Sequence, residues 1–128
     1  MVKIYVEAAR ASNPSSRNLK NYLAPALIIS SLNNSPDILQ FLLLNGADAD
    51  TRAKDGYGVT GLHIAATNNF EEIARLFIAA NADLNIVEDR YKRTPLISAC
   101  LRNATEVALM LIENKAIVDI TDKDQILA

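Results

Sequence analysis

Residues 60–85 have the sequence TGLHIAATNNFEEIARLFIAANADLN, and this stretch decides the fold. It contains a short apolar segment, a break rich in asparagine, a longer apolar segment and a tail built on alanine. The same order occurs from Leu27 to Asp50 and from Leu96 to Asp119, with a period of about 34 residues. A period of this size indicates stacked repeats that bury their faces against their neighbours. The pattern therefore favours a binding protein over an enzyme with an enclosed pocket.

Helix start and stop signals recur inside each unit. Thr60 is predicted to cap a short helix that begins at the next residue, and Thr94 has the same role one unit later. Asn69 with Glu72 predicts a capping box for the second helix. Asn81 suits the left-handed position where that helix ends. Each unit is therefore predicted to be a pair of helices.

Apolar residues also occupy matching positions in the three units, and we expect them to form ladders through the stack. The three predicted ladders are Ile38, Ile73 and Val107; Leu42, Phe77 and Leu111; and Leu43, Ile78 and Ile112.

These motifs resemble a known family. Residues 60–66 and 94–100 resemble the Thr-Pro-Leu-His-x-Ala-Ala signature of ankyrin repeats, and residues 46–50 and 81–85 resemble its Gly-Ala-Asp-Val-Asn tail. The resemblance covers about residues 24–128. It implies an all-α solenoid of helix–turn–helix units with projecting β-turn fingers. It also implies protein recognition by the finger tips and the concave faces of the first helices.

Three residues depart from the family pattern. Gly61 replaces the proline that starts the first helix, Ile97 replaces the histidine, and Lys92 takes a glycine position. The two fingers are also longer than the family pattern, by about two residues before Asp55 and one before Asp89, so their shape is expected to differ from that of the family. The family histidine ties the finger to the helix start, which implies a structural role for His63.

The two ends of the chain do not fit the repeat. We interpret residues 1–23 as a degenerate N-terminal capping segment and residues 24–128 as the repeat domain, which closes with the start of a fourth repeat. A solenoid needs a polar outer face on its last unit. The hypothesis is that the segment belongs to a longer array, or that its open end self-associates.

Composition limits the partners. The 128 residues carry a formal net charge of −2, which argues against nucleic acid because phosphate neutralisation requires a basic face. No apolar run has the length of a signal peptide or a membrane span, so we expect an intracellular protein, cytoplasmic or nuclear, with no membrane partner. Cys100 is the single cysteine and is expected to be a buried, unreactive thiol.

Two groups of residues are candidates for partner binding. Tyrosine and arginine are enriched in interface hot spots, and the two fingers supply both; the second group follows the short first helices. The finger candidates are Arg52, Lys54, Tyr57, Arg90, Tyr91 and Arg93, and the helix candidates are Asn68, Leu101 and Arg102. The alternatives are that the turns are simply polar, with tyrosine covering its neighbour, and that Leu101 and its counterpart Leu32 cap the core.

No set of residues indicates catalysis. His63 has no second histidine, cysteine pair or nucleophile motif beside it, and Glu71 and Glu72 are explained by the helix dipole. We therefore predict a non-catalytic interaction module without cofactor or metal, which binds a protein or peptide with an acidic or tyrosine-friendly surface. The alternatives are a spacer of a longer array with no partner of its own, or an inhibitor that covers another enzyme's site.

Overall fold

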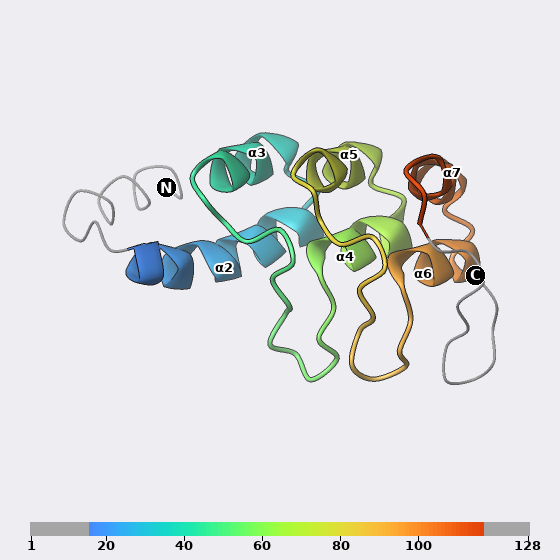
Figure 1. Cartoon of the computed structure of the whole chain (residues 1–128), viewed down its shortest axis with the longest axis horizontal. Coiled ribbons are helices and arrows are strands. Elements are labelled where there is room, and N and C mark those ends of the chain that lie inside the picture. The colour runs from blue at the N-terminus through green and yellow to red at the C-terminus, as the bar shows by residue number, and fades with distance from the viewer. Residues whose placement is uncertain (1–15, 117–128) are drawn as a thin grey trace.

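The chain forms a stack of helical hairpins. The computed structural model describes residues 16–116, with side chains from Tyr22 onward. Its helices are α2 (Ser16–Leu32), α3 (Pro36–Leu44), α4 (Gly61–Asn68), α5 (Glu71–Ala79), α6 (Pro95–Leu101) and α7 (Thr105–Glu113). The first helices α2, α4 and α6 form one layer, the second helices form another, and two long loops project from the same side (Figure 1). The predicted all-α repeat solenoid is confirmed, and no strand occurs within residues 16–116.

Contacts between hairpins run in line through both layers. Helix α4 packs against α2 and α6, and α5 packs against α3 and α7. The ladder of Leu42, Phe77 and Leu111 is fully buried, as predicted. A second buried ladder consists of the leucines that begin the three units, Leu27, Leu62 and Leu96. The core is therefore continuous from the first hairpin to the third.

Two predicted ladders are incomplete. In the ladder of Leu43, Ile78 and Ile112, the first two residues are half-buried and Ile112 is 47% exposed. The other incomplete ladder begins with Ile38. Ile73 and Val107 are fully buried, whereas Ile38 is 41% exposed and Leu39 beside it is buried instead. Helix α3, which carries Ile38, packs against α2 and α5, so it has one second-helix neighbour where α5 has two. The end position of α3 in the described stack accounts for this exposure.

The first helix of the stack is longer than its counterparts. Helix α2 has 17 residues and contains Pro25, which occupies the position of the capping Thr60 in the next unit. Within the described residues, helix and not a finger precedes this position, so no cap is needed where the later units have one. The predicted boundary between residues 23 and 24 falls inside α2, and the division into two segments stays a prediction. The predicted start of a fourth repeat lies outside the described residues.

The predicted threonine caps are present. The Thr60 side chain accepts a hydrogen bond from the His63 backbone N–H at 3.3 Å, and the Thr94 side chain accepts one from Ile97 at 3.2 Å. Asn81 is left-handed, with φ of 62°, as predicted for a helix exit. These contacts fix where the first helices begin and where the second helix ends.

The capping box predicted for Asn69 is wrong. Helix α5 begins after Phe70 without a side-chain cap, whereas Asn69 ends α4 in the left-handed conformation with φ of 56°. Its amide accepts a hydrogen bond from the Val107 N–H at 3.2 Å and donates one to Glu106 at 2.6 Å. The left-handed backbone directs the side chain to the next hairpin, so Asn69 joins two repeats instead of capping a helix.

Gly61 replaces the family proline for a steric reason. A Cβ atom at this position would lie 2.1 Å from the Phe77 ring, and Phe77 is fully buried. The corresponding second-helix residues in the other units are the smaller Leu42 and Leu111. The large ring in the middle hairpin therefore requires the small residue at the helix start.

Candidate protein-binding surface

The first finger (residues 51–60) is closed by backbone pairing and by one aspartate. Arg52 and Thr60 form an antiparallel bridge, and the Ala53 N–H donates to the Val59 carbonyl at 2.7 Å. The Asp55 carboxylate accepts hydrogen bonds from the N–H groups of the two residues before Val59, at 2.9 and 3.1 Å. Aspartate is favoured in turns because it satisfies backbone donors in this way. The finger is therefore a tight, ordered hairpin.

The second finger (residues 86–94) is organised by a different residue. Glu88 is 4% exposed, and its carboxylate accepts hydrogen bonds from the N–H groups of Arg90, Tyr91 and Arg93 at 2.9, 2.7 and 3.1 Å. Its own N–H donates to the Arg93 carbonyl at 3.0 Å. Lys92 is left-handed at φ of 60°, as its glycine position implies. The two fingers therefore differ from one another in shape.

Sequence reasoning did not identify Glu88. Its counterpart in the first finger is Lys54, 34 residues earlier, so the repeat alignment gives no hint of a shared role. The available signal is local. An acidic residue near the start of a turn can accept hydrogen bonds from backbone N–H groups two to five positions later, as Glu88 does from Arg90, Tyr91 and Arg93.

The two fingers are joined to one another. The Asp89 N–H donates to the Tyr57 carbonyl at 2.6 Å. The Arg52 guanidinium donates to the carbonyls of Gly58 and Val87, both at 2.8 Å, and lies 3.5 Å from the Asp89 carboxylate. One arginine side chain thus satisfies backbone groups of both fingers. Arg52, a predicted binding residue, lies within the joint between the fingers.

His63 ties the second finger to α4. Its Nδ1 accepts from the Thr60 N–H at 3.2 Å, so the proton is on Nε2, which donates to the Arg93 carbonyl at 2.8 Å. Burial lowers the pKa of His63, against the smaller opposing effects of this hydrogen bond and of Glu88. The neutral ring is therefore the form that fits. The geometry agrees with the structural role that the family resemblance implies.

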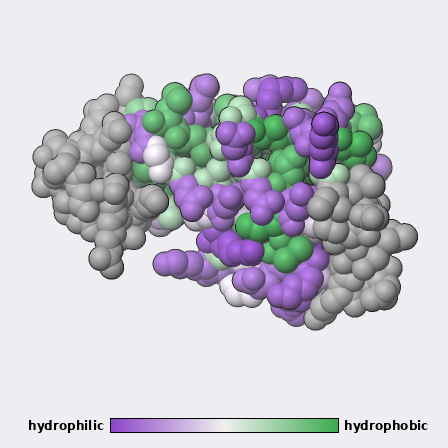
Figure 2. Space-filling view, viewed as in Figure 1, coloured by the Kyte–Doolittle hydropathy of each residue, from purple (hydrophilic) through white to green (hydrophobic). Residues whose placement is uncertain are grey.

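Four predicted finger residues form a continuous aromatic–cationic ridge. Arg90 donates to the Tyr57 hydroxyl at 2.9 Å, and its guanidinium lies 4.9 Å from the Tyr57 ring and 5.3 Å from the Tyr91 ring. The Arg93 guanidinium lies 4.6 Å from the Tyr91 ring. We call Tyr57, Arg90, Tyr91 and Arg93 the ridge. Hydrophilic side chains dominate the finger region on the face in Figure 2.

The remaining predicted residues lie away from the ridge. Asn68, Leu101 and Arg102 are exposed, but they lie at the last residues of α4 and α6 or directly after them, whereas the fingers join the first turns of these helices. The Asn68 amide donates to the Ile64 carbonyl of its own helix at 2.9 Å. Lys54 is exposed on the first finger. The structure therefore divides the predicted site into a finger group and a helix-exit group.

The predicted burial of Cys100 is wrong. This thiol is exposed, whereas Ala66 at the equivalent position is fully buried. Helix α4, which carries Ala66, has a first helix on both sides, α2 and α6. Among the described helices α6 has such a neighbour on one side only. The difference between the two positions follows from this place in the stack.

The described residues contain neither a membrane-spanning helix nor a cluster of metal ligands. None of the helices between residues 16 and 116 has both the length and the apolar character needed to cross a bilayer. Within the same range, no three His, Cys, Asp or Glu side chains gather in an arrangement that could hold a metal ion.

The comparisons with known proteins agree with the motifs and the hairpin geometry. The family described as "Ankyrin repeats (3 copies)" matches residues 27–124. The chain therefore belongs to the ankyrin-repeat family, whose repeats generally serve as protein–protein interaction modules and are generally non-catalytic.

The chain is similar to parts of three proteins from a plant, mouse and human. The chain is 28% identical over 90 residues to the E3 ubiquitin-protein ligase KEG of Arabidopsis thaliana. It is 28% identical over 96 residues to the B-cell lymphoma 3 protein homolog of Mus musculus, and 34% identical over 83 residues to the human neurogenic locus notch homolog protein 1. These alignments cover 70%, 73% and 65% of this chain but only 6%, 21% and 3% of the three proteins. The chain therefore spans about a fifth or less of the length of these relatives.

Proposed function

We propose that this chain is a non-catalytic recognition module that binds another protein or an extended peptide through its fingers and first helices. The observation that carries the proposal is the ridge. Tyr57 is 39% exposed and Arg90 is exposed, and both are already fixed by contacts within the protein. Side chains held in place before binding lose little entropy when a partner arrives. Tyrosine and arginine in this state are typical interface anchors.

The expected partner has an acidic or tyrosine-friendly surface, and the setting is intracellular. Arginine planes stack on aromatic rings and bind carboxylates in a bidentate manner. Asp55 and Glu88 direct their carboxylates to the backbone of their own fingers. They therefore compete less with an acidic partner for the arginine and lysine side chains of the fingers. Local positive charge therefore remains at the finger tips despite the negative total.

The test is a selection of peptides from a phage-displayed random library on the whole chain, followed by fluorescence anisotropy with the selected peptides. Tyr57→Ala and Arg90→Ala are expected to weaken binding by roughly tenfold each, the scale of a hot-spot truncation. Arg75→Ala removes an exposed arginine from α5 and is the matched control. Its affinity should equal that of the original chain.

Two outcomes would contradict the proposal. Selected peptides that bind the two ridge variants with undiminished affinity would exclude the ridge as the binding site. Failure to select any specific peptide would favour the alternative of a spacer without a partner of its own. Thermal unfolding of each variant separates lost binding from lost folding.

A further inference from the structure

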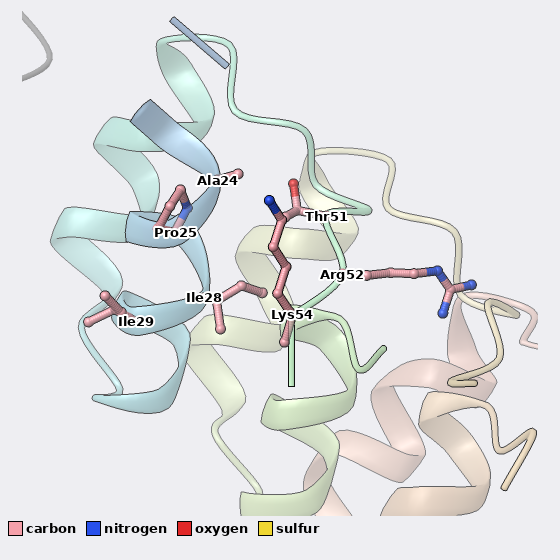
Figure 3. Close-up of a pocket in the computed structure, with 8 residues that line it drawn as sticks. Ala24, Pro25, Ile28, Ile29, Thr51, Arg52 and Lys54 are labelled. Carbon is pink, nitrogen blue, oxygen red and sulfur yellow. The ribbon is translucent and has the colours of Figure 1, made fainter. Parts of the chain in front are cut away.

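A hollow of about 310 Å³ lies between α2 and the first finger, away from the ridge. We call it the α2 hollow. Ala24, Pro25, Ile28 and Ile29 of α2 line one side, and Ala53 and Lys54 line the other (Figure 3). Its volume lies at the lower end of the range of about 300–1,000 Å³ for ligand pockets. This size suits one or two side chains of a peptide.

The hollow exists because one histidine is absent. His63 spans the corresponding place in the next unit and holds the second finger through the Arg93 carbonyl. Ile28 stands 35 residues before His63, the same interval that separates Leu27 from Leu62. The side chain of isoleucine has no N–H to donate, so Ile28 makes no such tie to the first finger. The space between them remains open and apolar.

The α2 hollow has one cationic end. Arg52 also lines it, but its guanidinium is directed away, to the carbonyls of Gly58 and Val87 (Figure 3). Lys54 is exposed, and its ammonium makes no hydrogen bond or ion pair with another described residue. The Lys54 side chain extends along the hollow in Figure 3. Its methylene stem adds to the apolar wall while its charge stays in water.

The acidic residues nearest to Lys54 in sequence are engaged elsewhere. The nearest is the adjacent Asp55, whose carboxylate accepts hydrogen bonds from the Tyr57 and Gly58 N–H groups at 2.9 and 3.1 Å. None of the eight residues that line the α2 hollow is acidic. The Asp50 carboxylate accepts from the Asp83 N–H at 2.8 Å, and the Asp48 carboxylate accepts from the Asp50 N–H at 3.0 Å. The charge of Lys54 is therefore available to a ligand.

Apolar surface continues from the hollow along α2. Ile29 and Leu32 are each 56% exposed and stand three residues apart, on one side of the helix. Their counterparts in α4 are Ile64, which is 6% exposed, and Thr67, which is polar. Exposed apolar surface next to a pocket is typical of a binding groove.

We propose that the α2 hollow binds an apolar side chain of a partner peptide whose neighbouring residue is Asp or Glu, with the carboxylate on Lys54. The apolar wall selects a branched aliphatic or aromatic side chain. The ammonium selects a carboxylate beside it and disfavours a cation. This proposal rests on the proposed function and names the chemistry of one anchor of the partner.

The test uses short blocked peptides and NMR titration of the whole chain. The probes are acetyl-Gly-Ser-Leu-Glu-Ser-Gly-amide and three relatives in which Leu-Glu is replaced by Leu-Gln, Ala-Glu or Leu-Lys. The Leu-Glu peptide should shift the methyl signals of Ile28 and Ile29 and the amide of Lys54, with a dissociation constant on the order of millimolar. Each of the three other peptides should bind at least about fivefold more weakly.

Variants locate the contact. Lys54→Glu should weaken the Leu-Glu peptide about tenfold and make the Leu-Lys peptide the better ligand. Ala24→Leu places a larger side chain in the hollow and should abolish the methyl shifts. Lys92→Glu makes the same charge change at an exposed lysine of the second finger and should leave the affinity unchanged.

Three results would overturn the assignment: equal binding of the Leu-Glu and Leu-Gln peptides, shifts confined to residues outside the hollow, or equal effects of Lys54→Glu and Lys92→Glu. The proposed function fails separately, because it depends on Tyr57 and Arg90 and on peptides selected without reference to the hollow. A chain that binds selected peptides at the ridge but gives no shifts at Ile28 would refute only this assignment.

Discussion

At the scale of single residues, Gly61 and Phe77 depend on each other. A Cβ at residue 61 would overlap the buried Phe77 ring, and the Ser31 hydroxyl oxygen would lie 2.9 Å away. Replacing glycine by alanine normally favours a helix by about 1 kcal/mol. The steric overlap destabilises the fold, and its cost exceeds this gain, because the fully buried Phe77 ring has no free space into which it could move.

Gly61→Ala is therefore expected to lower the free energy of unfolding by about 1–3 kcal/mol. In the Phe77→Leu background, which restores the residue found at positions 42 and 111, the same substitution should cost less. Urea denaturation of the two single variants, the double variant and the original chain measures the coupling. Additive effects within about 0.5 kcal/mol would show that the ring does not set the requirement for glycine.

His63 makes stability depend on pH. Burial lowers its pKa in the folded chain, so the unfolded chain binds the proton more readily. The contribution of the neutral ring is complete above about pH 6.5, the usual histidine value, and is lost as the pH falls from there toward the folded pKa.

The measurement is urea unfolding between pH 8 and pH 5 for the original chain and for His63→Gln. Unfolding free energy should fall with decreasing pH more steeply in the original chain. His63 is the single histidine of the chain, so its ring proton signal also gives the folded pKa without overlap. A folded pKa at or above 6.5 would contradict the buried, neutral assignment.

At the scale of elements, the second finger depends on one acidic side chain. Glu88 accepts three backbone hydrogen bonds in a loop that also contains the left-handed Lys92. Glu88→Ala leaves these donors without their partner, and a buried unsatisfied donor costs about 1–3 kcal/mol. Lys54→Ala, at the equivalent exposed position of the first finger, should change stability by less than about 0.5 kcal/mol.

Amide hydrogen exchange separates the two effects. Glu88→Ala should increase amide exchange at Tyr91 and Arg93. The amides of α5 should lose protection only by the amount that the lower global stability predicts. An unchanged second finger in this variant would mean that the backbone pairing alone holds its shape.

The elements were largely predictable from the sequence, and their connections less so. Thr60 and Thr94 mark helix starts through local chemistry, and the buried leucines follow from the repeat. Asn69 was misassigned because the direction of its side chain depends on a left-handed backbone that the sequence does not specify. The proximity of Tyr57 and Tyr91 follows from the period.

Other features of the site required the three-dimensional structure. The α2 hollow depends on a contact that Ile28 does not make, and an absent contact leaves no motif. Arg52 appeared as a surface residue in the sequence, yet it donates to two carbonyls because two fingers meet at its position. Such roles arise from residues that are far apart in the chain.

At the scale of the whole molecule, the repeats should unfold together. Helix α5 contacts α3, α4 and α7, and Phe77 lies in the middle of the fully buried ladder. Phe77→Ala should lower the free energy of unfolding by about 3–5 kcal/mol. Because each hairpin relies on its neighbours, amide protection should fall in α2 and α7 as well as in α5. Loss of protection confined to α5 would argue for independently stable hairpins.

The joint between the fingers has a consequence for protein engineering. The two fingers cannot be exchanged independently of one another. The Asp89–Tyr57 backbone hydrogen bond and the Arg52 side chain join them into one rigid unit. Transplanting either finger alone would leave backbone donors or acceptors of the other finger without their hydrogen-bond partners. A chimera must therefore move both loops together with Arg52, or randomise only the outward side chains of the pair.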